Sequence, residues 1–600
     1  MKKTTFSVVA SVLLASTLNA NESGIVVYSA TKSNQSIQDV TSNIEIITAA
    51  QLESKHITNL TDAINLASGI TFTRDGGAGQ PTKINIRGMH QTNTLVLIDG
   101  VRFNDITNSD GVSFEFLDMS DVQRIEVIKG AQSGIWGASA SGGVINIITK
   151  KTTATKEKIS LLYERGSFAS QKIAFNLLTS SKEGFIKAGF NKTKTDGYSA
   201  QTTNNTDLED VEKDDFSNTT SYVGAGLNLT PTDTIQLNTR TIDAKGEYDS
   251  YLSPDDETRV YDAKINIHSM NYSHTKDNYN LNLYTQKSDF DRDYPNDFTT
   301  NYKGSTATFG FKSKIDYRTN DFLIVGSETN THKDNGLDKE YTNKAYFLTN
   351  TNKFKNTIFT TSIRKDNNDK FGEHTTSKIG LKQLYKDMYV SMNYGTAFKA
   401  PTLNQLYTPF YGNEELEAEE TKAYDINFGY KGLTLSYFEN KIDNLISFHS
   451  TTYQNINIEG ESIIKGYEVN YKKALNTFLI SFNYTSVDAK DKDDNLIGRI
   501  PEENLKVSID YFGIKKFNFN LNANYVGERY DRNYSAFNTP TPNGEQTGKY
   551  TVINSVVDYK YNKNTNLYLK IDNIADKEYE VIDGYSTSPR AYYVGINAKF

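Results

Sequence analysis

Acidic side chains gather in two short segments of this chain, at residues 207–215 and 247–257. Ca²⁺ is a hard cation that takes about six to eight oxygen ligands, and carboxylates are among its preferred ligands. One segment alone offers too few carboxylates, so a calcium site requires a fold that brings both segments together. Two solvated acidic loops are the alternative explanation.

The other reactive residue types give no arrangement that an enzyme would need. The chain has no cysteine, which removes thiol catalysis, disulfides and cysteine-ligated metals, and its seven histidines accompany no GxSxG motif. Its net charge of −8 argues against nucleic-acid binding, which needs a basic surface. We therefore expect no enzymatic activity and no nucleic-acid partner.

Residues 1–20 have the pattern of a secretory signal peptide. Lys2 and Lys3 precede an apolar stretch at residues 6–14, and small residues continue to Ala20. The apolar stretch is well below the ~20 residues that a membrane-spanning helix needs, and no longer one follows. Export without a helical anchor leaves the periplasm, the exterior and the outer membrane as destinations.

Two regions with different patterns must position the functional residues. Residues 35–150 predict an α+β domain with helical spacing at 49–65. Its predicted strands cover residues 44–47, 83–88, 94–100, 124–130 and 143–150. Residues 155–600 instead repeat alternating strands between polar turns, and about 22 strands fit at roughly 20 residues per strand and turn.

The second region has the composition of a membrane barrel. The mean hydropathy of −0.57 is compatible with a barrel, because only every second residue of a barrel strand faces lipid. The chain also has 39 Tyr and 31 Phe, the residue types that form the aromatic girdles at the membrane interfaces. The last strand, residues 591–600, alternates strictly and ends on Phe600. We predict a transmembrane antiparallel β-barrel whose lumen is filled by the N-terminal α+β domain as a plug, because so wide a barrel would otherwise be open.

Several motifs resemble the TonB-dependent outer-membrane receptors over essentially the whole mature chain. In the first region these are IRG at 86–88, VLIDGVR at 96–102 and the long run at 124–150. In the second region they are FKAP at 398–401 and KGYE at 465–468. The resemblance implies energised uptake across the outer membrane: a scarce nutrient binds outside, and the inner-membrane TonB complex pulls on the plug.

The segment that TonB would bind is implied near the start of the mature chain, at residues 24–31. An extended, β-prone segment can add as a strand to the edge of a partner's sheet. The residues of this predicted TonB box are Ile25, Val26, Val27, Tyr28, Ser29 and Ala30. The alternative is that they form only the first strand of the plug.

Within the family the resemblance is strongest to receptors for cobalamin, which implies positions for a ligand and for calcium. The implied substrate-binding residues are Lys83, His90, Asn108, Ser109, Ser250, Arg499 and Tyr534. The implied calcium ligands are Glu212, Asp214, Tyr248, Asp249 and Glu257. Ser199 stands where those receptors supply a carboxylate. Amide, hydroxyl and aromatic contacts suit a large, amide-studded corrinoid better than charge does.

Two other ligands remain open within the same family. His90 on the plug could ligate haem iron, although no second well-placed histidine is obvious. A ferric siderophore is anionic and calls for basic loops, whereas the loops here are acidic.

The resemblance also implies a latch in which Arg87 and Arg124 of the plug pair with Glu419 and Glu468 of the barrel. We expect a monomer whose outer face contacts outer-membrane lipid.

Overall fold

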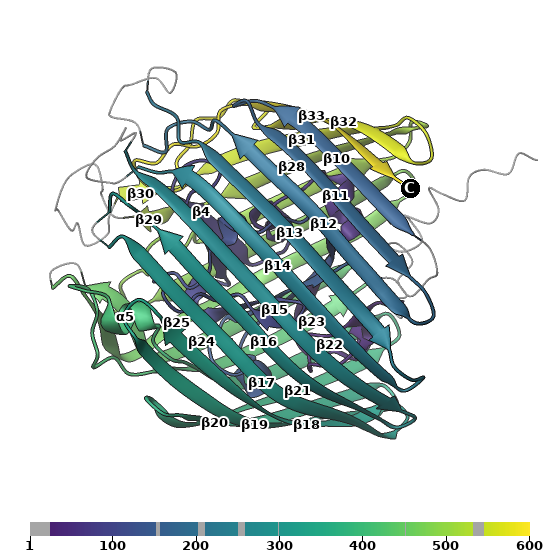
Figure 1. The fold of residues 1–600 in the computed structure, drawn as a ribbon, viewed down its shortest axis with the longest axis vertical. Helices are drawn as coiled ribbons and strands as arrows, with labels where there is room; N and C mark the ends of the chain where they lie inside the picture. The colour runs from purple at the N-terminus through teal and green to yellow at the C-terminus, as the bar shows by residue number, and fades with distance from the viewer. Residues whose placement is uncertain are drawn as a thin grey trace, which may run out of the picture.

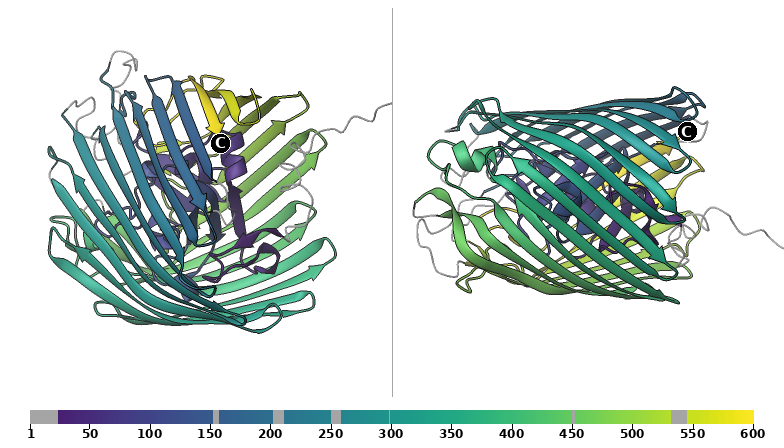
Figure 2. Two further views of the ribbon diagram at one scale, coloured as in Figure 1. Left: turned by 45° about the vertical axis from the view of Figure 1, so that its right-hand side comes forward. Right: turned by 90° about the horizontal axis from the view of Figure 1, so that it is seen from below.

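The structure is a computed structural model that describes residues 24–151, 157–201, 211–249, 258–297, 299–449, 452–531 and 545–600. The predicted signal peptide lies outside these residues. The described chain forms a wide barrel with a smaller α+β domain inside it (Figures 1 and 2). No helix in this part of the chain is long and apolar enough to cross a membrane.

The barrel closes through 22 antiparallel strands of the described chain, in sequence order except that β28 pairs directly with β31. Closure joins the first strand to the last, with Leu161 opposite Ala598. The strands are β10 (Lys158–Gly166), β11 (Gln171–Ser180), β12 (Gly184–Thr195), β13 (Phe216–Asn228), β14 (Asp233–Glu247), β15 (Val260–Lys276), β16 (Tyr279–Asp293), β17 (Asn301–Arg318), β18 (Asp321–Asp334), β19 (Lys339–Phe354), β20 (Thr357–Asn368), β21 (Gly372–Tyr385), β22 (Met388–Lys399), β23 (Glu419–Tyr430), β24 (Leu433–His449), β25 (Gln454–Leu475), β26 (Phe478–Lys490), β27 (Glu503–Tyr511), β28 (Phe517–Val526), β31 (Tyr550–Lys560), β32 (Thr565–Asp572) and β33 (Ala591–Lys599). The predicted barrel and its strand number are confirmed.

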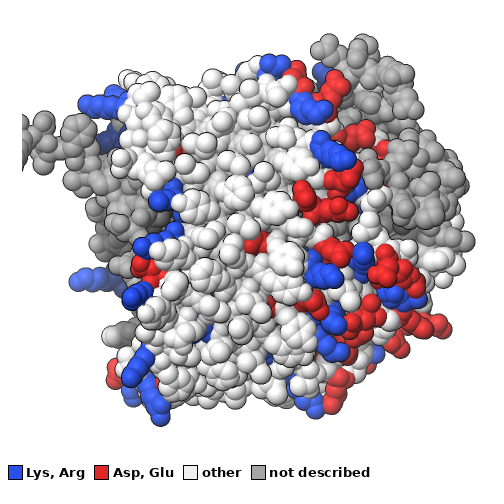
Figure 3. Space-filling model, turned by 180° about the vertical axis from the view of Figure 1, so that it is seen from behind, with Lys and Arg blue, Asp and Glu red and all other residues white. Residues whose placement is uncertain are grey.

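Alternation along the strands gives the barrel two different faces. Large apolar side chains such as Leu161, Phe309 and Ile596 are exposed on the outside, while buried polar side chains face the lumen. Figure 3 shows the outside as a broad uncharged band with charged side chains at both margins. The uncharged band is the surface that contacts the membrane, and the outward-facing apolar side chains of the strands form it.

The two ends of the barrel differ in their connections. At one end the turns are tight, as at Lys431 and Gly432, which both have positive φ (46° and 86°), the geometry that a two-residue hairpin turn requires. At the other end the connections are long, and one contains α5 (Leu403–Tyr407) and another β29 (Arg529–Asp531) and β30 (Glu545–Thr547). Long loops face the exterior in such barrels, so this end is the external one.

The plug is built on a five-stranded mixed sheet in the order β3-β8-β9-β6-β7. Its strands are β3 (Ile44–Thr48), β8 (Val122–Lys129), β9 (Gly143–Thr149), β6 (Thr94–Ile98) and β7 (Val101–Arg102). Two small hairpins join it, β1 (Val26–Val27) with β2 (Gln35–Ser36), and β4 (Ile70–Arg74) with β5 (Thr82–Ile86). Strand β5 ends at Ile86 because Arg87 and Gly88 take positive φ.

The plug helices are short and cap the sheet. They are α2 (Ala49–Ser54), α3 (Leu60–Ile64), α4 (Ser133–Trp136) and the 3₁₀ turns η2 (Ile37–Asp39), η3 (Gln91–Asn93) and η4 (Phe114–Phe116). The single helix predicted over 49–65 was wrong, because His56 takes φ of 48° and Asn59 starts a new helix by accepting from the Asp62 N–H at 2.9 Å.

The largest apolar core spans the plug and one side of the barrel. Plug residues such as Phe103 and Phe114 belong to the same buried cluster as Tyr261 and Phe290 of the barrel, and the Phe103 and Phe290 rings lie 5.8 Å apart. The plug is therefore held on this side by apolar packing.

Candidate functional site

The predicted TonB box is folded into the plug at the end of the barrel opposite the long loops. Val26 and Val27 pair with Ser36 and Gln35, which makes them the first strand of a small hairpin. The N–H groups of Tyr28 and Ser29 donate to the Glu126 carboxylate at 3.0 and 2.8 Å, and the Ser29 hydroxyl donates to it at 2.6 Å. The expectation of an extended segment therefore holds only for its first residues.

Three further contacts hold the same segment. The Trp136 indole N–H donates to the Ser29 carbonyl at 2.7 Å, and the Asn146 amide donates to the Ser29 hydroxyl at 2.9 Å. Lys312 of the barrel donates to the Tyr28 hydroxyl. Burial raises the pKa of that hydroxyl, so it stays neutral. Glu126 and Trp136 both lie in the 124–150 motif, but the motif alone does not indicate that they face this segment.

A buried charge cluster joins plug to barrel at Glu468 of β25. Arg87 Nη2 lies 2.8 Å from one carboxylate oxygen of Glu468, and Lys129 Nζ lies 3.1 Å from the other. Lys129 also contacts Glu45 at 2.6 Å. Gly69 allows this approach, since it has φ of 62° and a Cβ there would lie 2.0 Å from Glu468 Oε1. The pairing of Arg87 with Glu468 is present as expected.

The other half of the predicted latch was wrong. Arg124 pairs with Glu126 within the plug at 2.7 Å, and Glu419 pairs with Lys399 of the barrel at 2.8 Å. The reason is geometric: Arg124 and Lys129 are five residues apart on β8, so their side chains point to opposite faces of the sheet. Glu419 is directly opposite Lys399 in the strand register. Lys129, which sequence reasoning missed, is the second cation on Glu468.

Four of the predicted substrate residues lie in the plug at the external end, Lys83 on β5 and His90, Asn108 and Ser109 on loops. Lys83 forms an ion pair with Asp110 at 3.1 Å, and Asn108 accepts from the Asp110 N–H at 2.9 Å. The His90 ring is 2.9 Å from the Thr92 hydroxyl, and Ser109 is exposed. Although burial opposes ionisation, Lys83 lowers the pKa of Asp110, and Asp110 in turn raises the pKa of Lys83.

Of the substrate residues predicted on the barrel, Arg499 is the one within the described residues. Arg499 pairs with Asp531 at 2.7 Å and has φ of 64°. Its charge lowers the pKa of Asp75 in the plug, although burial outweighs this effect and raises that pKa overall. The predicted Ser250 and Tyr534 lie outside the described residues. The described part of the floor thus presents paired charges beside amide and hydroxyl groups.

Three of the five predicted calcium ligands come together beside the external loops. Carboxylate oxygens of Glu212, Asp214 and Asp249 all lie within 4.8 Å of one another. Burial and then the neighbouring Asp249 raise the pKa of Asp214 to about 8, the expected result when acids crowd together. The donor set of hard oxygens fits Ca²⁺.

Backbone contacts fix two of these carboxylates. The Ala200 N–H donates to Asp214 at 2.5 Å, and the Gln201 N–H donates to Asp249 at 2.6 Å. Ser199 donates to Asp249 at 3.2 Å. The Tyr248 hydroxyl donates instead to Asp297 at 3.3 Å, and the predicted Glu257 lies outside the described residues.

Comparisons with known proteins agree with this architecture. Residues 170–574 match the family described as TonB dependent receptor-like, beta-barrel, and residues 36–144 match the TonB-dependent Receptor Plug Domain. A Vitamin B12 transporter BtuB of Vibrio cholerae is 29% identical over 634 aligned residues, covering 100% of both chains.

Solved structures share the fold. The siderophore receptor PirA of Acinetobacter baumannii superposes with a TM-score of 0.79 at 17% identity, covering 93% of this chain and 98% of its own. A mutant of the ferric enterobactin receptor PfeA of Pseudomonas aeruginosa gives 0.79 at 20% identity, covering 96% and 100%. At these identities the likeness concerns the fold.

A lipid-facing barrel with a plug clamped in its lumen defines the class of plugged outer-membrane receptors. With the barrel match covering more than half of its length, the chain belongs to the TonB-dependent receptor family. It resides in the outer membrane, and membership implies a small-molecule ligand outside and TonB as the periplasmic partner.

Proposed function

We propose that this receptor imports cobalamin. The observation that carries the proposal is the external floor, where Lys83 with Asp110 and Arg499 with Asp531 neutralise each other beside amides and hydroxyls. A neutral, amide-rich corrinoid suits such a surface, because its amides can bond to these groups without an excess charge. The relative named as a vitamin B12 transporter, similar over its full length, supports the same ligand.

We further propose that Ca²⁺ bound by Glu212, Asp214 and Asp249 orders the external loops for the ligand. The three carboxylates come from the segments that precede β13 and follow β14, so one ion would tie two loops together. Asp249→Asn is expected to weaken the effect of Ca²⁺ because it removes one charged ligand. Asp262→Asn, on the exposed outer face of β15, is the matched control.

Titration of the purified receptor with cyanocobalamin, with and without Ca²⁺, tests both proposals. We expect saturable binding that Ca²⁺ tightens in the wild type and in Asp262→Asn, but less in Asp249→Asn. Ferric enterobactin and haemin serve as competing ligands, since solved structures of similar fold include siderophore receptors. Saturable binding of either of these, without binding of cyanocobalamin, would reassign the substrate.

We also propose that residues 25–30 are the segment that TonB binds. Supporting this, Val26 and Val27 form the first strand of the described chain, and Tyr28 contacts Lys312 of β17 toward the end of the barrel opposite the external loops. In the conformation described here Glu126 and Trp136 hold them, so TonB would engage them after release from those contacts.

A further inference from the structure

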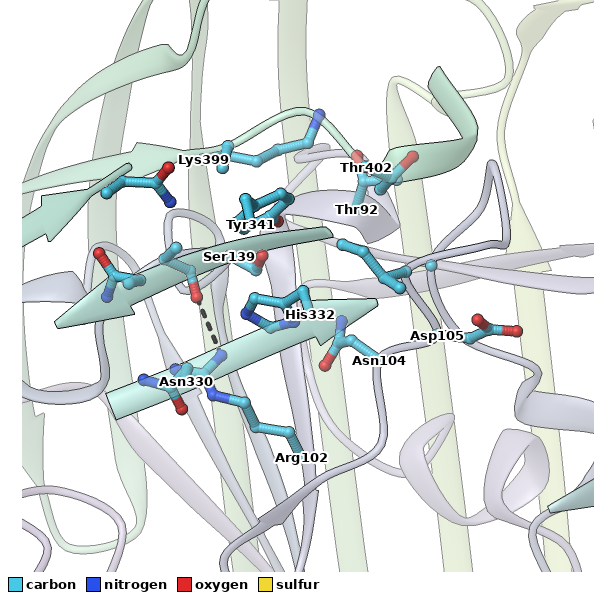
Figure 4. A pocket seen from close by; sticks show the side chains of 16 residues that line it. Thr92, Arg102, Asn104, Asp105, Ser139, Asn330, His332, Tyr341, Lys399 and Thr402 are labelled. Atoms are coloured by element: carbon cyan, nitrogen blue, oxygen red, sulfur yellow. Dashed lines mark hydrogen bonds between the residues drawn. The ribbon is translucent and has the colours of Figure 1, made fainter. Parts of the chain in front are cut away.

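A polar crevice lies between the plug and one wall of the barrel (Figure 4). On the plug side it is lined by Thr92, Arg102 and residues 104–106 and 138–139. On the barrel side it is lined by the external parts of β18, β19 and β22, including His332 and Tyr341. Neither the predicted ligand residues nor the latch uses it.

Arg102 brings a charge to this crevice without a close ion-pair partner. Its guanidinium donates to the carbonyls of Trp136 at 2.6 Å and Ala138 at 3.2 Å. Among the described residues it forms no ion pair within 4.0 Å, and Glu328 and Asp366 act on it only from farther away. A guanidinium has five N–H donors, so three remain. The other charges of the lining are already compensated, because Asp105 pairs with Arg292 at 3.0 Å and Lys399 with Glu419 at 2.8 Å.

The barrel wall adds further hydrogen-bond capacity. The Tyr341 hydroxyl makes no hydrogen bond to any described residue, although the residue is only 4% exposed. His332 bonds Thr306 through Nδ1 at 3.0 Å, which leaves Nε2, and Asn330 accepts from Thr308 through its oxygen, which leaves its NH₂ group. Figure 4 shows these side chains around the same space as Arg102. The crevice is therefore rich in donors and suits a group that carries several acceptor oxygens.

The crevice also adjoins the floor on which the ligand is proposed to bind. Thr92 lines it and bonds the ring of His90, and residues 105, 106 and 111 of its lining flank the loop that carries Asn108 and Ser109. A ligand on the floor could extend a side group into it without leaving the plug loops.

We propose that this crevice is a second ligand subsite that binds a phosphate diester, with Arg102 as the residue that contacts it. Arginine matches phosphate oxygens through paired N–H donors, and a site shielded from water strengthens such bonds. The inference rests on the proposed function, because cobalamin carries one phosphate diester in its nucleotide side group. It deepens that function by assigning this group to the crevice and the corrin amides to the floor.

The experiment compares cyanocobalamin with cyanocobinamide, which lacks the nucleotide side group and its phosphate diester. Equilibrium binding of both to the purified full-length receptor is measured for the wild type, Arg102→Gln and Tyr341→Phe. A charge-assisted contact predicts about tenfold or more weakening of cyanocobalamin by Arg102→Gln and less than about twofold for cyanocobinamide. Tyr341→Phe, which keeps the ring packing, should weaken cyanocobalamin alone, by a smaller factor.

Retained binding of cyanocobinamide shows that the variants are folded. Arg318→Gln, at an exposed position at the opposite end of the barrel, is the control for the loss of one positive charge. Equal weakening of both ligands by Arg102→Gln would make Arg102 a support for the loop at residues 136–138 and overturn the subsite. Unchanged affinity for cyanocobalamin would overturn it as well. If the wild type binds neither corrinoid, the proposed function fails and the subsite fails with it.

Discussion

At the scale of single residues, Glu468 has the most consequential position in the plug–barrel interface. It is buried on the barrel wall and faces two plug cations, Arg87 and Lys129, which are 2% and 0% exposed. Removing one member of a buried charge cluster is costly, because the remaining charges lose their compensation in a region with little water.

Glu468→Gln should therefore loosen the plug within an intact barrel. Arg87 would face a neutral amide and Lys129 would keep only Glu45, and loss of the buried charge costs about 3 kcal/mol of docking free energy. Hydrogen exchange of β5 and β8 should speed up, while exchange in the barrel strands stays unchanged. Glu461→Gln on the same strand is the matched control, since Glu461 is only half-buried and pairs with Lys441 within the barrel. Equal exchange rates in the two variants would contradict the latch.

At the scale of elements, short segments of the plug depend on side chains from other elements. The hairpin of β1 and β2 has only two residue pairs, too few for a stable structure by itself. Glu126 on β8 supplies what it lacks, because this fully buried carboxylate accepts from two N–H groups and one hydroxyl of residues 28 and 29.

Glu126→Gln should release the segment at residues 25–29. The substitution replaces charge-assisted hydrogen bonds by weaker ones and turns an NH₂ group toward donors, so the mobile population should rise about tenfold. A spin label on Val26→Cys reports this population, and the absence of other cysteines makes the labelling specific. Glu183→Gln, at an exposed turn, is the control. An unchanged spectrum in Glu126→Gln would show that Trp136 and Asn146 suffice to hold the segment.

At the scale of the whole molecule, different parts of the chain serve ligand capture and energy coupling in transport. The outer membrane holds no ion gradient, so the energy for plug movement must come through the TonB partner that the family implies. The external floor includes Arg499 in the connection between β26 and β27, whereas Tyr28 of the N-terminal segment contacts Lys312 toward the opposite end of β17. Ligand capture and energy coupling should therefore be separable by mutation.

Deletion of residues 25–30 tests this separation in cells. We expect energy-dependent uptake of labelled cyanocobalamin to stop while binding to the cell surface persists, because the floor residues remain in place. Val26→Thr, which keeps the backbone donors and a β-branched side chain, is the control and should transport normally. Uptake that continues after the deletion would favour a passive channel.

The sequence by itself determined the barrel, its strand number and the presence of the plug. Because one face of each barrel strand contacts lipid, apolar and polar residues alternate along the strand, and this alternation can be read from the local sequence. The long motif at residues 124–150 identifies the plug from the sequence alone. Only the tertiary structure decided which charges meet. Arg124 and Glu126 are two residues apart on one face of β8, so their pairing is local, but nothing local indicates that Lys129 on the opposite face meets Glu468 of the barrel. The crevice at Arg102 likewise depends on contacts between residues more than two hundred positions apart, which side-chain periodicity does not encode.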